Sequence, residues 1–198
     1  MLQALAEFFV LAATAIFAEN AVFSRGLGMS RMIRMPVDAV SRTRFCLIVT
    51  AMSTACTGIG WWLNRFIREA EYAIFIRPMM YIGLICVLYC AVWLLGRKFW
   101  PKFFAGIRGD LAMATFNCAV LGPALLASQS SFTFPKALGF GLGSGIGYLG
   151  AVLLVGQVRQ RLELCDVPKA FRGFPITLGY IGLLSLALYG LIGHRLPI

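Results

Sequence analysis

Apolar residues run through this chain in six long stretches separated by short polar segments. The stretches cover residues 3–23, 43–63, 74–95, 111–128, 136–157 and 173–193. An α-helix needs about 20 predominantly apolar residues to cross the hydrocarbon core of a bilayer, and each stretch is close to that length. The pattern therefore predicts an all-α integral membrane protein with about six transmembrane helices.

Composition favours a single membrane domain over residues 1–198. Hydrophobic residues make up 60% of the chain and charged residues 13%, whereas soluble domains carry far more charge. This excludes a second, water-soluble domain. The first stretch lacks a basic segment before it and leads into Glu19-Asn20 instead of a small-residue cleavage site, so we expect it to be retained and not removed as a secretory signal.

Positive charges are divided unevenly between the two sets of loops. The richer set carries Arg25, Arg31, Arg34, Arg42 and Arg44, then Arg97, Lys98, Lys102 and Arg108, then Arg159, Arg161, Lys169 and Arg172. Because cytoplasmic loops carry the excess of lysine and arginine, we expect these loops in the cytoplasm and both termini outside. The formal net charge of +10 is explained by this topology, and no nucleic-acid partner is needed to explain it.

The first and fourth stretches contain residues that interrupt helices. The first ends in FAENAVFSRGLGMS and the fourth contains TFNCAVLGPALL, so an asparagine followed by small and apolar residues occurs in each half. Three spans per half would insert residues 1–100 and 101–198 in opposite orientations, as in inverted-repeat transporters. Broken helices are tolerated at membrane depth where they are buried in protein or line a cavity. These two segments are therefore the candidate site, although helix packing alone would also explain such residues.

Glu19, Asn20 and Asn117 are the candidates for an ion pathway. An ionisable group beside a predicted helix break in an apolar span is by default a hypothesis for ion or proton transfer. The alternative for Glu19 is a position near the membrane interface, where it caps a helix or pairs with an arginine such as Arg25. The sequence leaves both interpretations open.

Cysteines and glycines carry weaker signals. The six cysteines follow no metal-ligand spacing, and most are interpreted as small apolar packing residues. Gly139, Gly143 and Gly147 recur every four residues, which predicts a helix face that a neighbouring helix approaches closely. The segment GIGYLG matches the dinucleotide-binding fingerprint formally, but no strand precedes it, so that function is excluded.

Four segments taken together carry a family resemblance. They are ENAVFSRGLGMS, NCAVLG, GFGLGSGIGYLG and DVPKAFRG, in this order. With the span number, they make the chain resemble the six-span membrane subunits of the Rnf and Nqr redox-driven ion pumps, the group formed by the A-type subunits of Rnf and the E-type subunits of Nqr. The resemblance covers nearly the whole chain.

This resemblance implies a subunit, not catalytic alone, of a ferredoxin:NAD oxidoreductase that couples electron transport to Na⁺ or H⁺ transport across a bacterial inner membrane. The alternative within the family is a sodium-pumping NADH:quinone oxidoreductase. The implied partners are a homologous six-helix subunit, the other subunits of an Rnf-type complex and membrane lipid.

The resemblance also implies an intramembrane [2Fe-2S] cluster between this subunit and its homologous partner, with two cysteines from each. Cys118 in NCAVLG matches one ligand position, but the family's other position, the end of LGMC, is Ser30 in LGMS here. Serine binds iron only as an alkoxide, which is harder and less readily formed than a thiolate. Three outcomes stay open: Ser30 binds iron, another residue or the partner completes the cluster, or the cluster is altered or absent.

Two other classes of function stay open beside the pump subunit. A stand-alone secondary transporter would also have inverted repeats and broken helices, and it would move a solute when purified alone. A structural membrane subunit would need no cluster, and the serine at position 30 favours that class.

Overall fold

The computed structural model describes residues 2–35, 38–67, 72–99, 101–130, 132–165, 168 and 171–192, and this part of the chain contains helices and turns but no strand. The all-α prediction is confirmed. The helices are α1 (Leu2–Phe17), α2 (Met29–Arg34), α3 (Ala39–Ile67), α4 (Ala73–Phe99), α5 (Pro101–Thr115), α6 (Cys118–Gln129), α7 (Phe134–Glu163) and α8 (Phe174–Ile192).

Within the described residues, three helices are long and apolar enough to cross a membrane, and the bent pair α5 and α6 would make a fourth span. The three are α3, α4 and α7, whereas α1 and α8 contain shorter apolar segments, Gln3–Phe17 and Phe174–Gly190. The prediction of about six full spans is thus met only in part. In the first stretch the reason is local: α1 ends at Phe17 and turns come after it, while a hydropathy count treats those turn residues as helical. The predicted placement of the termini involves residues 1 and 193–198, which lie outside the described part.

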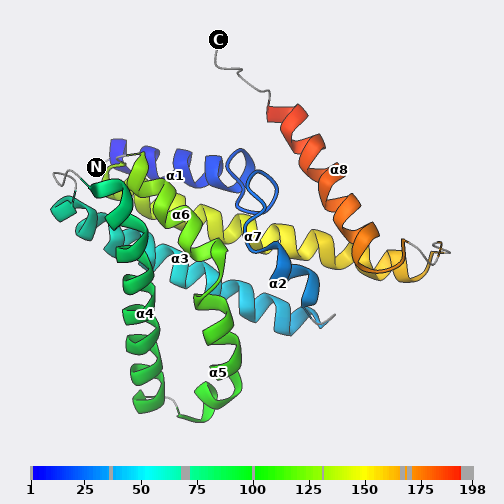
Figure 1. The fold of residues 1–198 in the computed structure, drawn as a ribbon, viewed down its shortest axis with the longest axis horizontal. Helices are drawn as coiled ribbons and strands as arrows, with labels where there is room; N and C mark the ends of the chain where they lie inside the picture. The colour runs from blue at the N-terminus through cyan, green and yellow to red at the C-terminus, as the bar shows by residue number, and fades with distance from the viewer. Residues whose placement is uncertain are drawn as a thin grey trace.

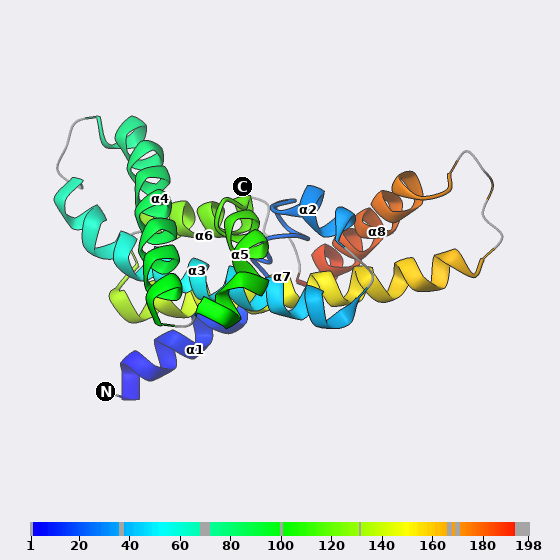
Figure 2. The same ribbon diagram turned by 90° about the horizontal axis from the view of Figure 1, so that it is seen from below.

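Helix α7 lies at the centre of the packing, between α1 and α3 (Figure 1). Helices α4 and α5 pack against each other and against α3, and α6 crosses α3 and α7. Helix α8 comes after α7 in the chain and slants away from the other helices in Figure 1, whereas in Figure 2 it runs back over α7 towards α2. The largest buried cluster joins the segment after α1 to α3 and α7, with Val22, Val49 and Val152 each at most 1% exposed.

The predicted glycine row of α7 faces α1. The row consists of Gly139, Gly143 and Gly147. A Cβ on the first would collide with the backbone carbonyl of Phe8, and a Cβ on the second with that of Ala12. On the third it would lie 2.9 Å from the side-chain nitrogen of Asn20. Helices can approach this closely only where side chains are absent, so the neighbour of the row is a helix of the same chain.

A second glycine row on α7 faces α3, and the sequence reasoning missed it. Gly141 accepts a hydrogen bond at its carbonyl oxygen from the Ser53 hydroxyl at 3.2 Å. A Cβ on Gly145 would lie 2.5 Å from the Cα of Thr50. Glycine at every second position from 139 to 147 therefore lets two helices approach α7 closely at once.

Arginines of the charge-rich loops also join helices. Arg44 on α3 forms an ion pair of 2.6 Å with Asp110 on α5. Arg159 on α7 donates hydrogen bonds to the carbonyl oxygens of Ile33, at 2.7 Å, and Met35, at 3.3 Å. Carbonyls at a helix C-terminus have no partner within the helix, and a cation satisfies them well. Arg159 thus fixes the end of the short helix α2 to α7.

Candidate functional site at the two helix breaks

The first break is held by the side chain of Asn20. Its Nδ2 donates to the carbonyl oxygens of Ile16, at 2.8 Å, and Gly147 on α7, at 3.2 Å. Its Oδ1 accepts from the backbone N–H groups of Val22, at 3.0 Å, and Phe23, at 3.3 Å. Asn20 is 4% exposed. One buried amide thus satisfies backbone groups released where the helix stops and ties this break to the middle of α7.

The second break is held by Asn117, which caps α6. Its Oδ1 accepts from the backbone N–H of Ala119 at 3.1 Å, the usual contact of a helix N-cap. Its Nδ2 donates to the hydroxyl of Tyr148 on α7 at 3.3 Å. That hydroxyl donates to the carbonyl oxygen of Gly28 at 3.4 Å. The chain Asn117–Tyr148–Gly28 therefore links the second break to the residue that precedes α2.

Gly28 allows the two breaks to approach each other. Its backbone is left-handed, with a φ of 74°. A Cβ there would lie 2.7 Å from the Tyr148 ring and 2.9 Å from the Oδ1 of Asn117. Both reasons favour glycine, because other residues are strained at this φ and lack the space. Gly147 and Tyr148, neighbours in α7, thus hold one break each.

Sequence reasoning selected both asparagines but missed Tyr148 and Gly28. Tyr148 is fully buried. A buried phenol hydroxyl generally needs a hydrogen-bond partner, and that requirement was the one signal available in the sequence. The partners themselves are 31 and 120 residues away along the chain.

Ser30 and Cys118 lie on the first turns of the helices that come after the two breaks. Cys118 is the first residue of α6, and Ser30 is the second residue of α2. Both residues are exposed. The two first turns are adjacent, since a Cβ on Gly28 would lie 3.1 Å from the Cβ of Ala119. The fold therefore presents an exposed thiol and an exposed hydroxyl on two adjacent helical turns.

Metal ligands within this chain alone are few. Among the described residues, no three His, Cys, Asp or Glu side chains are close enough to hold a metal ion. Cys46 and Cys56 are buried, while Cys86, Cys90 and Cys165 are exposed. Cys118 and Ser30 could supply part of a ligand set, and a second chain would have to supply the rest.

Glu19 forms an ion pair with Arg25. Its Oε2 lies 2.6 Å from the Nη2 of Arg25, and the two side chains are 43% and 41% exposed. This arrangement is the alternative that sequence reasoning weighed against an ion-pathway role. Asn20 and Asn117 are likewise engaged, because the nitrogen and the oxygen of each side-chain amide have hydrogen-bond partners.

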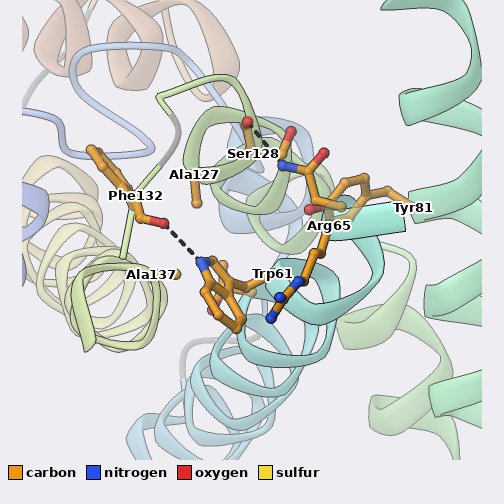
Figure 3. Close-up of a pocket in the computed structure, with 9 residues that line it drawn as sticks. Trp61, Arg65, Tyr81, Ala127, Ser128, Phe132 and Ala137 are labelled. Atoms are coloured by element: carbon orange, nitrogen blue, oxygen red, sulfur yellow. Dashed lines mark hydrogen bonds between the residues drawn. The ribbon is translucent and has the colours of Figure 1, made fainter. Parts of the chain in front are cut away.

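A small cavity of about 200 Å³ with both polar and apolar lining residues lies at the other end of α6 (Figure 3). Trp61 donates from Nε1 to the carbonyl oxygen of Phe132 at 2.8 Å, and Asn64 donates to that of Ser128 at 3.3 Å. The Oδ1 of Asn64 is buried without a hydrogen-bond partner among the described residues. Arg65 also lines the cavity. Water occupies about 30 Å³ per molecule, so the cavity can hold several waters beside that acceptor.

The chain is similar in sequence to a family of membrane proteins and to several named subunits of redox complexes. A family model described as "Rnf-Nqr subunit, membrane protein" matches residues 8–194. The chain is 32% identical to the A-type subunit of an "Ion-translocating oxidoreductase complex" of Syntrophotalea carbinolica, over 90% of this chain and 93% of that one. It is 30% identical to the A-type subunit of the "Na(+)-translocating ferredoxin:NAD(+) oxidoreductase complex" of Acetobacterium woodii, over 92% and 95%. It is 29% identical to the E-type subunit of a "Na(+)-translocating NADH-quinone reductase" of Marinobacter nauticus, also over 92% and 95%.

Proposed function

Since the chain belongs to the Rnf-Nqr family of membrane subunits, we propose that it is a subunit of a redox-driven ion-translocating oxidoreductase of the ferredoxin:NAD type. It would carry electrons through the membrane and would not be catalytic alone. The relatives named as subunits of ion-translocating oxidoreductases support this, because they are matched over 93% and 95% of their length.

The observation that carries the proposal is the meeting of the two helix breaks. Asn20, which follows the end of α1, donates a hydrogen bond to Gly147 of α7. Asn117, which precedes the start of α6, donates one to the next residue of α7, Tyr148. The next helical turns are adjacent and expose Ser30 and Cys118. An exposed pair of donors at a fixed junction is the arrangement that half of a cluster site between two chains requires.

A [2Fe-2S] cluster would be held by Cys118 and, in this proposal, by Ser30, with a homologous subunit supplying the other ligands. Such a cluster supplies one-electron transfer. Cys118 is the first residue of α6, and the partial positive charge at a helix N-terminus favours the negative charge of a cluster bound there. At Ser30 the ligand would be an alkoxide, which is a harder donor than a thiolate and would change the reduction potential.

We also propose that residues 1–100 and 101–198 form two inverted repeats. In each half a broken helix is followed by a long helix and then by another apolar helix: α1, α2, α3 and α4, then α5, α6, α7 and α8. The last helix of each half contacts the break of the other half. Helix α4 packs on α5 and α6, and Ser185 of α8 donates to the carbonyl oxygen of Phe23.

Ion coupling would act at the same junction. An electron that arrives at the junction would add negative charge there, and in a medium of low dielectric constant this charge favours a nearby cation. A cation that passes the breaks would compete for oxygen atoms of Asn20 and Asn117 that now accept backbone N–H groups. We propose that Na⁺ or H⁺ movement involves exchange of these bonds, and that the charge-rich loops lie in the cytoplasm with both termini outside.

The test is ion uptake by membrane vesicles that contain the assembled complex, driven by reduced ferredoxin with NAD⁺ as acceptor. Cys118→Ala should abolish uptake while assembly survives. The control is Cys90→Ala, which removes an exposed cysteine on α4 and should leave uptake unchanged. Uptake that persists in Cys118→Ala would contradict the proposed electron path.

A second candidate stays within the family. The relative of Marinobacter nauticus is named for NADH-quinone reduction, so the complex could take electrons from NADH to a quinone. Uptake driven by NADH and quinone, without any response to ferredoxin, would favour it. The remaining alternatives are a structural membrane subunit and a stand-alone transporter, neither of which needs a cluster. Only the serine at position 30 favours them.

A further inference from the structure

An arginine-lined cavity of about 480 Å³ lies between α2, α7 and α8, away from the junction of the breaks. Its charged lining comes from Arg34, Arg159 and Arg172. Ile33, Leu162 and Phe174 supply apolar walls. The cavity thus combines positive charge with a hydrophobic surface, and no step of the proposed electron path uses it.

The positive charge of this cavity is not neutralised by the described residues. None of the three arginines forms an ion pair within the described part of the chain, where the ion pairs are Glu19–Arg25, Arg44–Asp110 and Glu7–Lys136. Arg159 uses one nitrogen to hold the end of α2. Arg34 and Arg172 are exposed and line the cavity from α2 and from the segment before α8. Guanidinium groups gathered in this way bind phosphate groups well, because each offers several donors in a planar fork.

Apolar side chains surround the same end of the molecule. Leu164 is 90% exposed, Phe171 61% and Phe174 58%. Helix α8 diverges from α7 here (Figure 2). A soluble anion would leave this apolar surface in water, whereas a lipid covers it with its acyl chains.

We propose that this cavity binds the phosphate head group of an anionic phospholipid. Basic pockets between transmembrane helices are a common place for such head groups. The phosphate would lie between Arg34 and Arg172. The acyl chains would extend from the cavity over the apolar side chains of Ile33 and Phe174. One lipid would then connect α2, which comes after the first break, to α8, which has few other contacts with the helices.

Lipid binding to the full-length chain tests this proposal. The protein, purified in neutral detergent, would be titrated with phosphatidylglycerol, with phosphatidylcholine and with inorganic phosphate, and bound lipid counted by native mass spectrometry. We expect phosphatidylglycerol to bind more tightly than phosphatidylcholine. Arg34→Ala and Arg172→Ala should each weaken it about five-fold, and the double variant about 25-fold, because one basic residue near an anionic lipid contributes about that factor.

The matched control is Arg161→Ala, which removes an exposed arginine of α7 that does not line the cavity. This variant should leave the affinity for phosphatidylglycerol unchanged. A second control, the double variant Arg34→Lys with Arg172→Lys, keeps both positive charges and should retain the preference for phosphatidylglycerol. Equal binding of phosphatidylglycerol to the wild type and the double alanine variant would overturn the proposal. The proposal would also be overturned if inorganic phosphate bound and phosphatidylglycerol did not. A double alanine variant that lost a co-purifying subunit but bound lipid as before would overturn it too.

Discussion

The two helix breaks begin alike, with an asparagine in an apolar segment, and differ in the residues that come next. After Asn20 the chain passes through turns before the six-residue helix α2 starts at Met29. After Asn117 the helix α6 starts at once, and the axis bends by 42°. Asn20 bonds to the backbone of α7, and Asn117 to the side chain of Tyr148. The first break is thus a folded loop that depends on one amide, while the second is a capped bend in an otherwise continuous helix.

Asn20→Ala should have the largest effect on stability. It leaves the N–H groups of Val22 and Phe23 without their acceptor, and each buried donor left unsatisfied costs about 2 kcal/mol. We expect a loss of about 4 kcal/mol, measured as the free energy of unfolding in detergent. The control is Gln3→Ala, which removes an exposed amide of α1 and should have little effect. A loss no larger than that of Asn117→Ala would contradict the contrast between the breaks.

Gly28→Ala should come next, at about 3 kcal/mol, because two costs add. A left-handed backbone costs an L-residue about 1–2 kcal/mol, and crowding adds a similar amount. Gly26→Ala separates the two terms, because Gly26 has a φ of 66° but open space around its Cα. It should lose only the backbone term, about 1 kcal/mol. Equal losses in the two variants, measured by unfolding in detergent, would mean that the breaks do not meet at Gly28.

Asn117→Ala should cost about 1.5 kcal/mol, the sum of a helix cap and one hydrogen bond inside a membrane protein. Tyr148→Phe should cost about 0.6 kcal/mol. The double variant should lose less than the sum of both, because the two residues share a bond. A double-mutant cycle on unfolding in detergent measures that difference, and strict additivity would exclude the bond.

Local patterns in the sequence predicted the helices but not their lengths or their joints. The apolar stretches predicted helical segments because burial in lipid depends on each segment's own composition. Glycine at 139, 143 and 147 indicated a close helix contact, and the spacing alone could not name α1 as the neighbour. The stop of α1 at Phe17 depends on Asn20, whose partner Gly147 lies 127 residues away.

The candidate site was predictable only where residue type sets the chemistry. Asn20 and Asn117 stood out because amides are rare in apolar spans, and Cys118 and Ser30 because of a family resemblance. Tyr148 and the cavity beside Trp61 could not be found in this way. Their roles arise from contacts between helices that lie far apart in the chain, and no short motif records such contacts.

The exposed donors after the breaks lead to the main proposal, that this chain forms half of a cluster site. The direct measurement is electron paramagnetic resonance with iron analysis on the chain co-purified with its homologous partner and reduced by dithionite. We predict a [2Fe-2S] signal in the wild type and in Cys90→Ala, its loss in Cys118→Ala, and a changed signal in Ser30→Cys, where a thiolate replaces the serine oxygen. An intact wild-type pair without iron, or a signal that survives Cys118→Ala, would contradict a cluster site at this junction.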